Sequence, residues 1–336
     1  PDARADAMGS DATPQAPESG SDGAQPEPGD GPFPYPPSNV DPSSVDWEGL
    51  PAATLNCGIT EIDTSGSVSL RNWCGAAPKP VVRTQTGGGE VALITLRGLT
   101  LDQAATLRIT GARPIVFLVH GAVTLRGTLE ASARDGTPGP GGNLMCGTST
   151  GGNGAGEAGD EGTGGGGGGF GSKGGNGGES GNVSIGTGGA ARGNAQLTPL
   201  LGGCGGGRGG GCTGVAGAGG GAIQISASGA LLTSGDVRAL GGNGANGCGN
   251  DAGGTGAGSG GGILLEGATL NVDRQRISAA GGRGGDGQAG GDGGNGASAA
   301  ANAGEHGKNG GVSGGGGGGG GYGRVRLRAM GACTGC

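Results

Sequence analysis

Apolar and polar residues alternate over several short, β-branched stretches, a pattern that predicts β-strands. They are most frequent between residues 54 and 136, and further along the chain they recur between long glycine runs. No stretch combines a 3.6-residue apolar period with capping residues, so we expect an all-β protein with almost no α-helix. The expected strands are 91–101, 106–110, 114–119, 122–133, 182–187, 222–240, 263–279 and 323–330.

The strand-like stretches also repeat. HGAVTLRGTLEASARDG (120–136), SASGALLTSGDVRALGGNG (226–244) and LEGATLNVDRQRISAAGGRG (265–284) can be laid over one another. Each is an apolar pair, a glycine turn and a second short strand, and long glycine insertions separate them. Internal repetition of a strand–turn–strand unit is typical of solenoids, so we expect these units to stack as the rungs of a β-solenoid.

Glycine supplies 96 of the 336 residues, and 77 of them fall among the 187 positions of 137–323. Glycine occupies every third position from Gly156 to Gly177 and again from Gly281 to Gly296. A period of three matches an extended left-handed helix with three residues per turn. We therefore predict arms that form a bundle of polyglycine-II helices. A collagen triple helix is rejected because the intervening positions carry almost no proline, whereas floppy low-complexity loops remain the alternative.

The first 47 residues differ from the rest of the chain. They hold ten of the 17 prolines, and nine acidic residues against the single base Arg4. Alone, such a segment is disordered or extended. Within it, GPFPYPP (31–37) places Phe33 and Tyr35 on a stiff backbone suited to docking. We divide the chain into an acidic proline-rich tail or docking segment (1–47), a strand-rich part (48–136) and glycine-rich repeats with interspersed strands (137–336).

The remaining 289 residues hold 18 acids and 19 bases, without a basic patch. Nucleic acid is therefore not an expected partner. No apolar run approaches the ~20 residues of a bilayer span, so no membrane span is expected. A lipid anchor upstream of Pro1 is compatible with the sequence.

The chain contains an even number of cysteines, and their spacing does not repeat that of a zinc ribbon. They are Cys57, Cys74, Cys146, Cys204, Cys212, Cys248, Cys333 and Cys336. Four disulfides in an oxidising, extracellular or cell-surface compartment are the preferred interpretation. We expect Cys57 to pair with Cys74, and Cys333 with Cys336. The pairing of the other four stays open, and a redox role for the C-terminal CxxC is the less favoured alternative.

The sequence offers little for catalysis. It has two histidines and lacks a phosphate-binding GxxxxGK[ST] loop. GGRGGDGQAGGDGGNG (281–296) places Asp286 and Asp292 as in calcium-binding repeats, but lacks the apolar position that such repeats require. We therefore expect no enzymatic activity and no cofactor or metal.

Two resemblances add to this interpretation. The opening PDARADAMGSDA resembles the Asp/Ala/Pro-rich spacers that follow the acylated cysteine of Gram-negative surface lipoproteins. The triplet glycine period is similar to that of springtail antifreeze proteins and some phage tail-fibre adhesins. Together with the repeated strands, it resembles the glycine-rich β-helical surface proteins of Gram-negative bacteria, which implies a cell-surface location.

The predicted function is that of a non-catalytic structural protein of the cell surface or extracellular matrix. We expect its copies to assemble into filaments through the solenoid ends and the acidic tail, so its main partner is itself. RVRLR (324–328) presents Val325 and Leu327 to one side and arginines to the other. The self-assembly candidates are Phe33, Tyr35, Trp47, Arg324, Arg326 and Arg328. The alternative is a monomeric surface adhesin, or a glycan- or ice-binding module, with a cell-surface glycan as partner.

Overall fold

The computed structural model describes residues 33–156, 161–181, 184–211, 214–298 and 303–336. Within them the helical elements are three short 3-10 helices, η1 (Pro42–Ser44), η2 (Gly147–Ser149) and η3 (Arg274–Arg276), and no α-helix occurs. The expectation of an almost helix-free β protein is confirmed. The strands are β1 (Ala52–Leu55), β2 (Ile59–Asp63), β3 (Ser69–Arg71), β4 (Val81–Thr84), β5 (Glu90–Leu96), β6 (Gly98–Leu101), β7 (Thr106–Thr110), β8 (Ile115–Val119), β9 (Val123–Leu125), β10 (Thr128–Glu130), β11 (Ala222–Thr233), β12 (Val237–Arg238), β13 (Gly262–Val272), β14 (Ile277–Ser278), β15 (Arg324–Ala329) and β16 (Cys333–Thr334).

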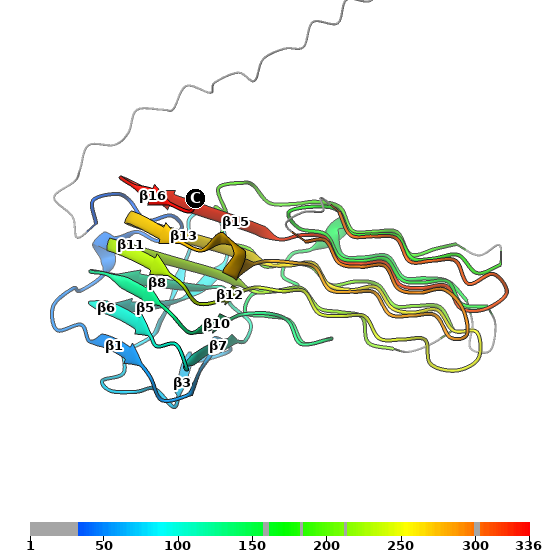
Figure 1. Cartoon of the computed structure of the whole chain (residues 1–336), viewed down its shortest axis with the longest axis horizontal. Coiled ribbons are helices and arrows are strands. Elements are labelled where there is room, and N and C mark those ends of the chain that lie inside the picture. Colours follow the sequence, from blue (N-terminus) through cyan, green and yellow to red (C-terminus); the bar gives the residue numbers. More distant parts are fainter. Residues whose placement is uncertain (1–32, 157–160, 182–183, 212–213, 299–302) are drawn as a thin grey trace, which may run out of the picture.

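The strands form two sheets (Figure 1). Sheet A has ten strands and curls into a half-barrel, and sheet B has the six strands β2, β3, β7, β10, β12 and β14. The long strands β11 and β13 span the curl of sheet A. Their first halves pair with the row of β5, β8 and β15, and their second halves with the row of β6, β9 and β16.

The pairings resolve into three parallel ladders, which the chain visits in a fixed order. Ladder 1 contains β5, β8, the first halves of β11 and β13, and β15. Ladder 2 contains β1, β6, β9, the second halves of β11 and β13, and β16. Ladder 3 contains β2, β7, β10, β12 and β14 of sheet B. Strands from before and after residue 137 therefore lie in the same sheets.

The repeat found in the sequence is visible as strand register. Val123 lies beside Leu231, which in turn lies beside Leu270 in ladder 2. In ladder 3, Val237 pairs with both Leu129 and Ile277. These six residues occupy two equivalent positions in the three superposed stretches, and all six side chains are buried in one core. The alignment of the three stretches is thus confirmed, because equivalent apolar residues stack on one another along the ladders.

The ladders enclose the main apolar core between sheets A and B. Alternate residues of each strand point inward, as expected from the two-residue period of a strand. Phe117 of β8 is the largest fully buried side chain of this core. Val68, Leu70 and Trp73 cover one end of this core, beside the antiparallel strands β3 and β4. At the other end Tyr322, Val325 and Leu327 are only partly buried.

One predicted strand, 182–187, is wrong where it can be compared. Residues 184–187 form no strand and belong to a glycine-rich segment, whereas 182 and 183 lie outside the described residues. Ser184 and Thr187 supply backbone carbonyls to Ala155 and Gly152. The physical reason is that the apolar residues of this stretch are too few to form a buried row, and the glycines on both sides favour the neighbouring segments.

Three long excursions leave the ladders, after β10, β12 and β14, and build a projection to one side of the sheets (Figure 1). Its central segments, 162–170, 252–262 and 314–321, are completely buried. The first of these donates backbone hydrogen bonds to three neighbouring segments in turn. The N–H groups of Gly162, Gly165 and Gly168 donate to the carbonyls of Asp251, Gly254 and Ala257 at 2.8–3.0 Å. Those of Gly164 and Gly167 donate to Gly178 and Gly175, and those of Thr163, Gly166 and Gly169 donate to Ala155, Gly152 and Ser149. Residues three apart therefore donate to the same neighbouring segment, so the triplet period seen in the sequence is present in the hydrogen bonding.

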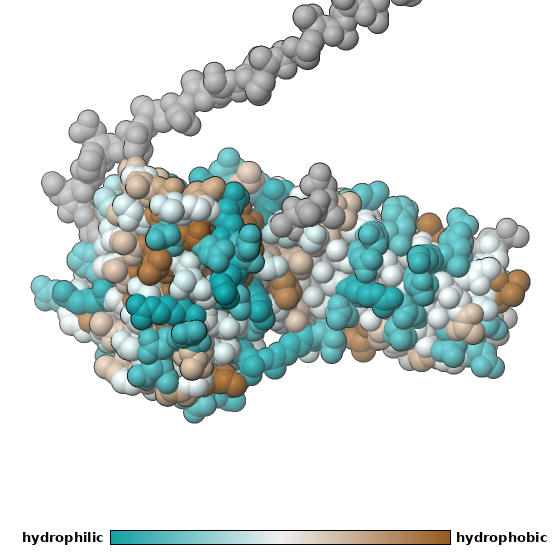
Figure 2. All heavy atoms as spheres, in the orientation of Figure 1, coloured by the Kyte–Doolittle hydropathy of each residue, from teal (hydrophilic) through white to brown (hydrophobic). Residues whose placement is uncertain are grey.

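The close approach of these segments requires glycine. A Cβ on Gly164 would overlap the carbonyl oxygen of Gly316, and a Cβ on Gly256 that of Gly166. The segments around these three central ones have one side that faces solvent. In these outer segments one residue in three points away from the bundle, and larger residues such as Lys173 occupy these positions. Figure 2 shows these hydrophilic side chains scattered over the pale surface of the projection. The glycine pattern thus reports which side of each segment faces a neighbour.

Asparagines complete the hydrogen bonding at the edge of the bundle. In an outer segment one N–H in three faces away from the central segments and needs another acceptor. The side-chain oxygens of Asn143, Asn153, Asn176 and Asn243 accept from the backbone N–H groups of Gly219, Arg208, Gly188 and Arg283 at 2.8–2.9 Å. All four asparagines occur in the sequence as Gly-Gly-Asn. This recurring triplet is a signal for the edge of the bundle that the sequence analysis missed.

Both expected disulfides, Cys57–Cys74 and Cys333–Cys336, are present. A third bond joins Cys146 to Cys204 across 58 residues, a loop whose closure contributes about 4 kcal/mol in the chain-entropy account. Cys248 is also disulfide-bonded, and Cys212 lies outside the described residues. These bonds agree with an oxidising compartment. The Cys146–Cys204 bond also ties the glycine-rich projection to its root at η2.

Gly256→Ala should destabilise the protein by at least about 2 kcal/mol, because the new methyl group would collide with a backbone carbonyl that cannot move aside. Thermal unfolding of the oxidised protein measures the loss. Gly89→Ala is the matched control, since a Cβ there meets nothing within 4 Å. Equal melting temperatures for the two variants would contradict the close packing of the projection.

Candidate functional site

The predicted self-assembly residues gather on the outer face of ladder 1. Residues 33–47, hereafter the N-terminal segment, lie across this face and bury Phe33, Tyr35 and Val40 to 5% exposure or less. Beneath them is a second apolar cluster, separate from the main core. It includes Val91, Leu93, Val116, Leu118, Phe170, Leu197, Leu200, Ala222 and Leu264. The docking role expected for the aromatic part of the tail is thus realised within the chain itself.

The aromatic side chains of the segment pack edge to face. The rings of Phe33 and Tyr35 have centroids 5.8 Å apart, and those of Phe33 and Trp47 are 5.5 Å apart. Trp47 contacts the imidazole of His120, which follows β8, at 5.5 Å. Such pairs add about 0.5–1.5 kcal/mol each to the burial of the rings. The prolines between the aromatics keep the segment extended, so little conformational entropy is lost when it docks.

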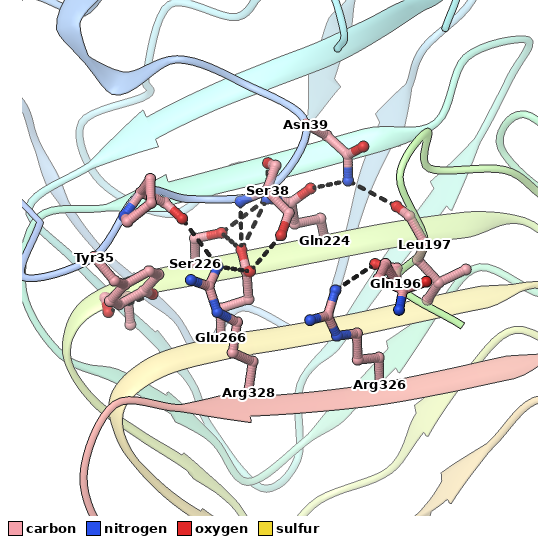
Figure 3. A network of polar contacts seen from close by, with 12 residues as sticks. Tyr35, Ser38, Asn39, Gln196, Leu197, Gln224, Ser226, Glu266, Arg326 and Arg328 are labelled. Atoms are coloured by element: carbon pink, nitrogen blue, oxygen red, sulfur yellow. Dashed lines mark hydrogen bonds and ion pairs between the residues drawn. The ribbon is translucent and has the colours of Figure 1, made fainter. Parts of the chain in front are cut away.

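A buried carboxylate fixes the middle of the segment (Figure 3). Glu266 of β13 is fully buried and accepts hydrogen bonds from the Ser38 backbone N–H at 3.1 Å and the Ser38 hydroxyl at 2.7 Å. On the sheet side it accepts from the Ser226 hydroxyl at 2.7 Å and the Gln224 amide at 3.1 Å. Arg328 of β15 completes an ion pair at 3.1 Å. A buried charge is costly unless paired, and here every partner that compensates it also holds the segment or its neighbouring strands.

Asn39 extends this network along the sheet. Its side-chain amide donates to the Gln224 side-chain oxygen and to the Leu197 carbonyl, both at 2.9 Å. The residue has a φ of +65°, a left-handed conformation that asparagine tolerates better than most residues. Its backbone carbonyl accepts from the Thr86 N–H at 2.9 Å. Asn39 therefore links the segment to β11, to the loop after β4 and to the glycine-rich excursion at once.

The three arginines of β15 all hold loops of the same chain. The Arg328 guanidinium lies over the Tyr35 ring at 5.4 Å and donates to the Pro36 carbonyl at 2.9 Å. Arg326 donates to the Gln196 carbonyl at 2.7 Å, and Arg324 to the Arg192 carbonyl. Val325 and Leu327 pack towards the core, so the predicted alternation of RVRLR is confirmed. The tail and the arginine row do meet, through Arg328, but inside one chain.

The surroundings shift the pKa of two of these groups. Burial raises the pKa of the Tyr35 phenol far above its ordinary value, and the nearby Glu266 carboxylate adds to the effect. The phenol donates to the Ala227 carbonyl at 2.8 Å, which it can do only while protonated. Burial lowers the pKa of Arg324. Glu266 and its hydrogen-bonding partners therefore form a polar network between apolar layers, and the charged groups of this network hold chain segments together.

Sequence reasoning missed the residues on the sheet side of this polar network. Gln224, Ser226 and Glu266 alternate with buried apolar residues of β11 and β13, so the pattern alone assigns them to a solvent-facing side. Only their polar character, at outward positions of strands flanked by glycine runs, distinguishes them. Their burial arises because the N-terminal segment, whose contacts with them span 185–228 residues of sequence, covers them.

The two ends of the ladders differ in how they are closed. Among the described strands, β3 and β4 add antiparallel edges at the N-terminal end, and residues 68–74 cover the core there. At the C-terminal end, β14, β15 and β16 each pair on one side only. A hollow of about 330 Å³ opens at this end, lined by Arg274, Ile277, Tyr322, Val325 and Leu327. Apolar core residues thus reach the surface at the C-terminal end.

Other features of the described residues do not converge with these. A hollow of about 590 Å³ is an open groove between sheet B and the root of the projection, lined by Arg108, Glu130 and Arg134 among others. Asp286 and Asp292, considered for calcium, are paired with Arg283 and Lys308. Groups of three or more His, Cys, Asp or Glu suited to a metal do not occur in the described part of the chain.

Comparison with known proteins finds no matching family model, curated protein or solved structure. The resemblance to glycine-rich β-helical surface proteins therefore stays a prediction. A search of the described residues also finds no helix with the length and apolarity needed to cross a bilayer.

Glu266→Gln should loosen the N-terminal segment and cost about 3 kcal/mol, because it removes one partner of a buried ion pair and replaces an acceptor oxygen by an amide NH2 that faces other donors. Faster amide exchange in residues 33–47, together with a lower melting temperature, would show the effect. Glu61→Gln breaks the half-exposed Arg108–Glu61 pair and should cost no more than about 1 kcal/mol. If amide exchange in residues 33–47 is unchanged in the Glu266→Gln variant, Glu266 does not hold the N-terminal segment.

The segment should also release at alkaline pH. The folded state keeps Tyr35 protonated beyond its ordinary pKa, so docking is at full strength below about pH 10 and weakens as pH rises further, where the undocked phenol ionises. Trp47 fluorescence, followed from about pH 9 upward, measures the release. Tyr35→Phe keeps the ring but cannot ionise, so its docking should be weaker by about 1 kcal/mol and nearly independent of pH. An identical alkaline transition in both proteins would exclude Tyr35 as its cause.

Proposed function

We propose that this protein is a non-catalytic structural subunit of the cell surface or extracellular matrix, and that its copies assemble with one another. One observation carries the proposal: the strand ladders end in unpaired edges, and at one end the apolar core reaches the surface. Sheet edges of this kind pair with further strands unless they are covered, and repeat proteins without polar caps associate through their ends.

The architecture fits a structural role. In this proposal the three ladders form a short β-solenoid, and the side projection is a bundle of polyglycine-II helices. The parallel, cyclic order of the ladders and the triplet hydrogen bonding support both assignments. Disulfides and dense backbone hydrogen bonds would give such a subunit rigidity outside the cell.

The tail enters the proposal in a modified form. Its aromatic residues Phe33, Tyr35 and Trp47 already pack against their own chain, so they are not free to bind a second copy. A role in assembly would require this segment to dock on a neighbour in place of its own body. Deleting residues 1–46 would uncover the apolar face of ladder 1, so loss of filaments in that variant would not identify the tail as the contact.

The oxidised full-length protein should form filaments under the negative-stain microscope, and a mass well above the 31.1 kDa of one chain by light scattering. Both measurements should depend on protein concentration, because association is bimolecular. A single 31.1 kDa species at every concentration would contradict self-assembly and favour the monomeric binding module.

A further inference from the structure

The two ends of the ladders can be compared strand by strand. At the C-terminal end, β15, β16 and β14 are the last strands of ladders 1, 2 and 3. At the N-terminal end the corresponding edges are β4, β1 and β3. Within the described residues each of these six strands is paired on one side only. Each end therefore offers one unpaired edge for each ladder.

We infer that copies of this chain join head to tail, with the C-terminal end of one copy against the N-terminal end of the next. This inference rests on the proposed self-assembly and names its contact surface. All three ladders would continue from copy to copy. Because β4 and β3 run antiparallel to their ladders, β15–β4 and β14–β3 would be antiparallel pairs, and β16–β1 a parallel pair.

The contact would also cover apolar side chains. Tyr322, Val325 and Leu327 rest on the core from one side and border the open hollow on the other. At the opposite end Leu70 and Trp73 are likewise half-buried over the core. Bringing these surfaces together removes apolar area from water, at about 25 cal/mol per Å², in addition to pairing the strand edges.

Charge distinguishes this arrangement from a two-fold contact between C-terminal ends. In a two-fold contact β15 would pair with its own copy and bring two rows of Arg324, Arg326 and Arg328 together. Like charges opposite one another across a strand pair are destabilising. Against β4 the row instead faces Val81 and a single arginine, Arg83, on the same side of the sheet. The head-to-tail contact therefore carries less repulsion.

The projection leaves room for such stacking. It extends sideways from the ladders, and in Figure 1 it does not pass over β16 at one end or β1 at the other. A heterologous contact of this kind does not close on itself, so it propagates into a filament. The projections would then line one side of that filament.

Leu327→Lys tests the contact. It places a charge in the end hollow and should abolish filaments of the oxidised full-length protein while leaving it a folded monomer by thermal unfolding. Val312→Lys, at a residue 78% exposed in the projection, is the matched control and should assemble normally. If Leu327→Lys does not fold, Thr334→Lys places a lysine on the exposed edge strand β16 without touching the core, and should also reduce assembly.

Mixing tests the polarity of the contact. A Leu327→Lys chain keeps an intact N-terminal end, so it should add to wild-type filaments and terminate them, shortening them at low molar ratios. If the variant fails to assemble and also leaves wild-type filaments at full length, the head-to-tail order is wrong. If Leu327→Lys and Thr334→Lys both assemble like wild type, the contact surface is wrong although the proposed function stands. A wild-type protein that never assembles would instead defeat the proposed function.

Discussion

Contact between bare backbones is the interaction on which the projection depends. A segment can donate hydrogen bonds to neighbours on three sides only if no side chain separates it from them, and in the central segments even a methyl group would meet a carbonyl oxygen. Ordering glycine costs more conformational entropy than ordering any other residue. The bundle offsets this cost by using nearly every inward-facing N–H, by the asparagine acceptors at its rim and by the Cys146–Cys204 bond.

The strand ladders supply what the glycine segments lack. Residues 252–261 lead directly into β13, and residues 314–323 lead into β15. The glycine segments therefore begin at the same spacing as the neighbouring strands that they continue. Strands with buried rows of Ile, Leu and Val have a register fixed by their side chains. Glycine segments have no side chains with which to fix one. Anchoring each excursion at both ends in a ladder gives it a defined starting point, from which the triplet hydrogen bonding follows.

The outer face of ladder 1 shows a different solution to the same shortage of large side chains. The N-terminal segment brings three of the seven aromatic residues of the chain onto one surface and seals it with the Glu266 network. Arg328 belongs to β15, the last strand of ladder 1, and donates hydrogen bonds both to Glu266 and to the Pro36 carbonyl of the N-terminal segment. The end of the ladders at which assembly is proposed is therefore coupled to the docking of the tail, through one side chain.

The sequence by itself determined the class of the fold and its rhythm. Alternation predicted the strands from β5 to β15 but not β1–β4 or β16. Superposition of three stretches predicted which residues stack, and the spacing of glycine predicted the hydrogen-bonding period, because each of these is a local property of the chain. Two disulfides with short separations followed for the same reason. The tertiary structure alone decided that Gln224, Ser226 and Glu266 are buried, that the tail docks on its own body, and that 184–187 join the bundle. Those outcomes depend on which distant segment covers a surface, and pairing between distant segments leaves no period in the sequence.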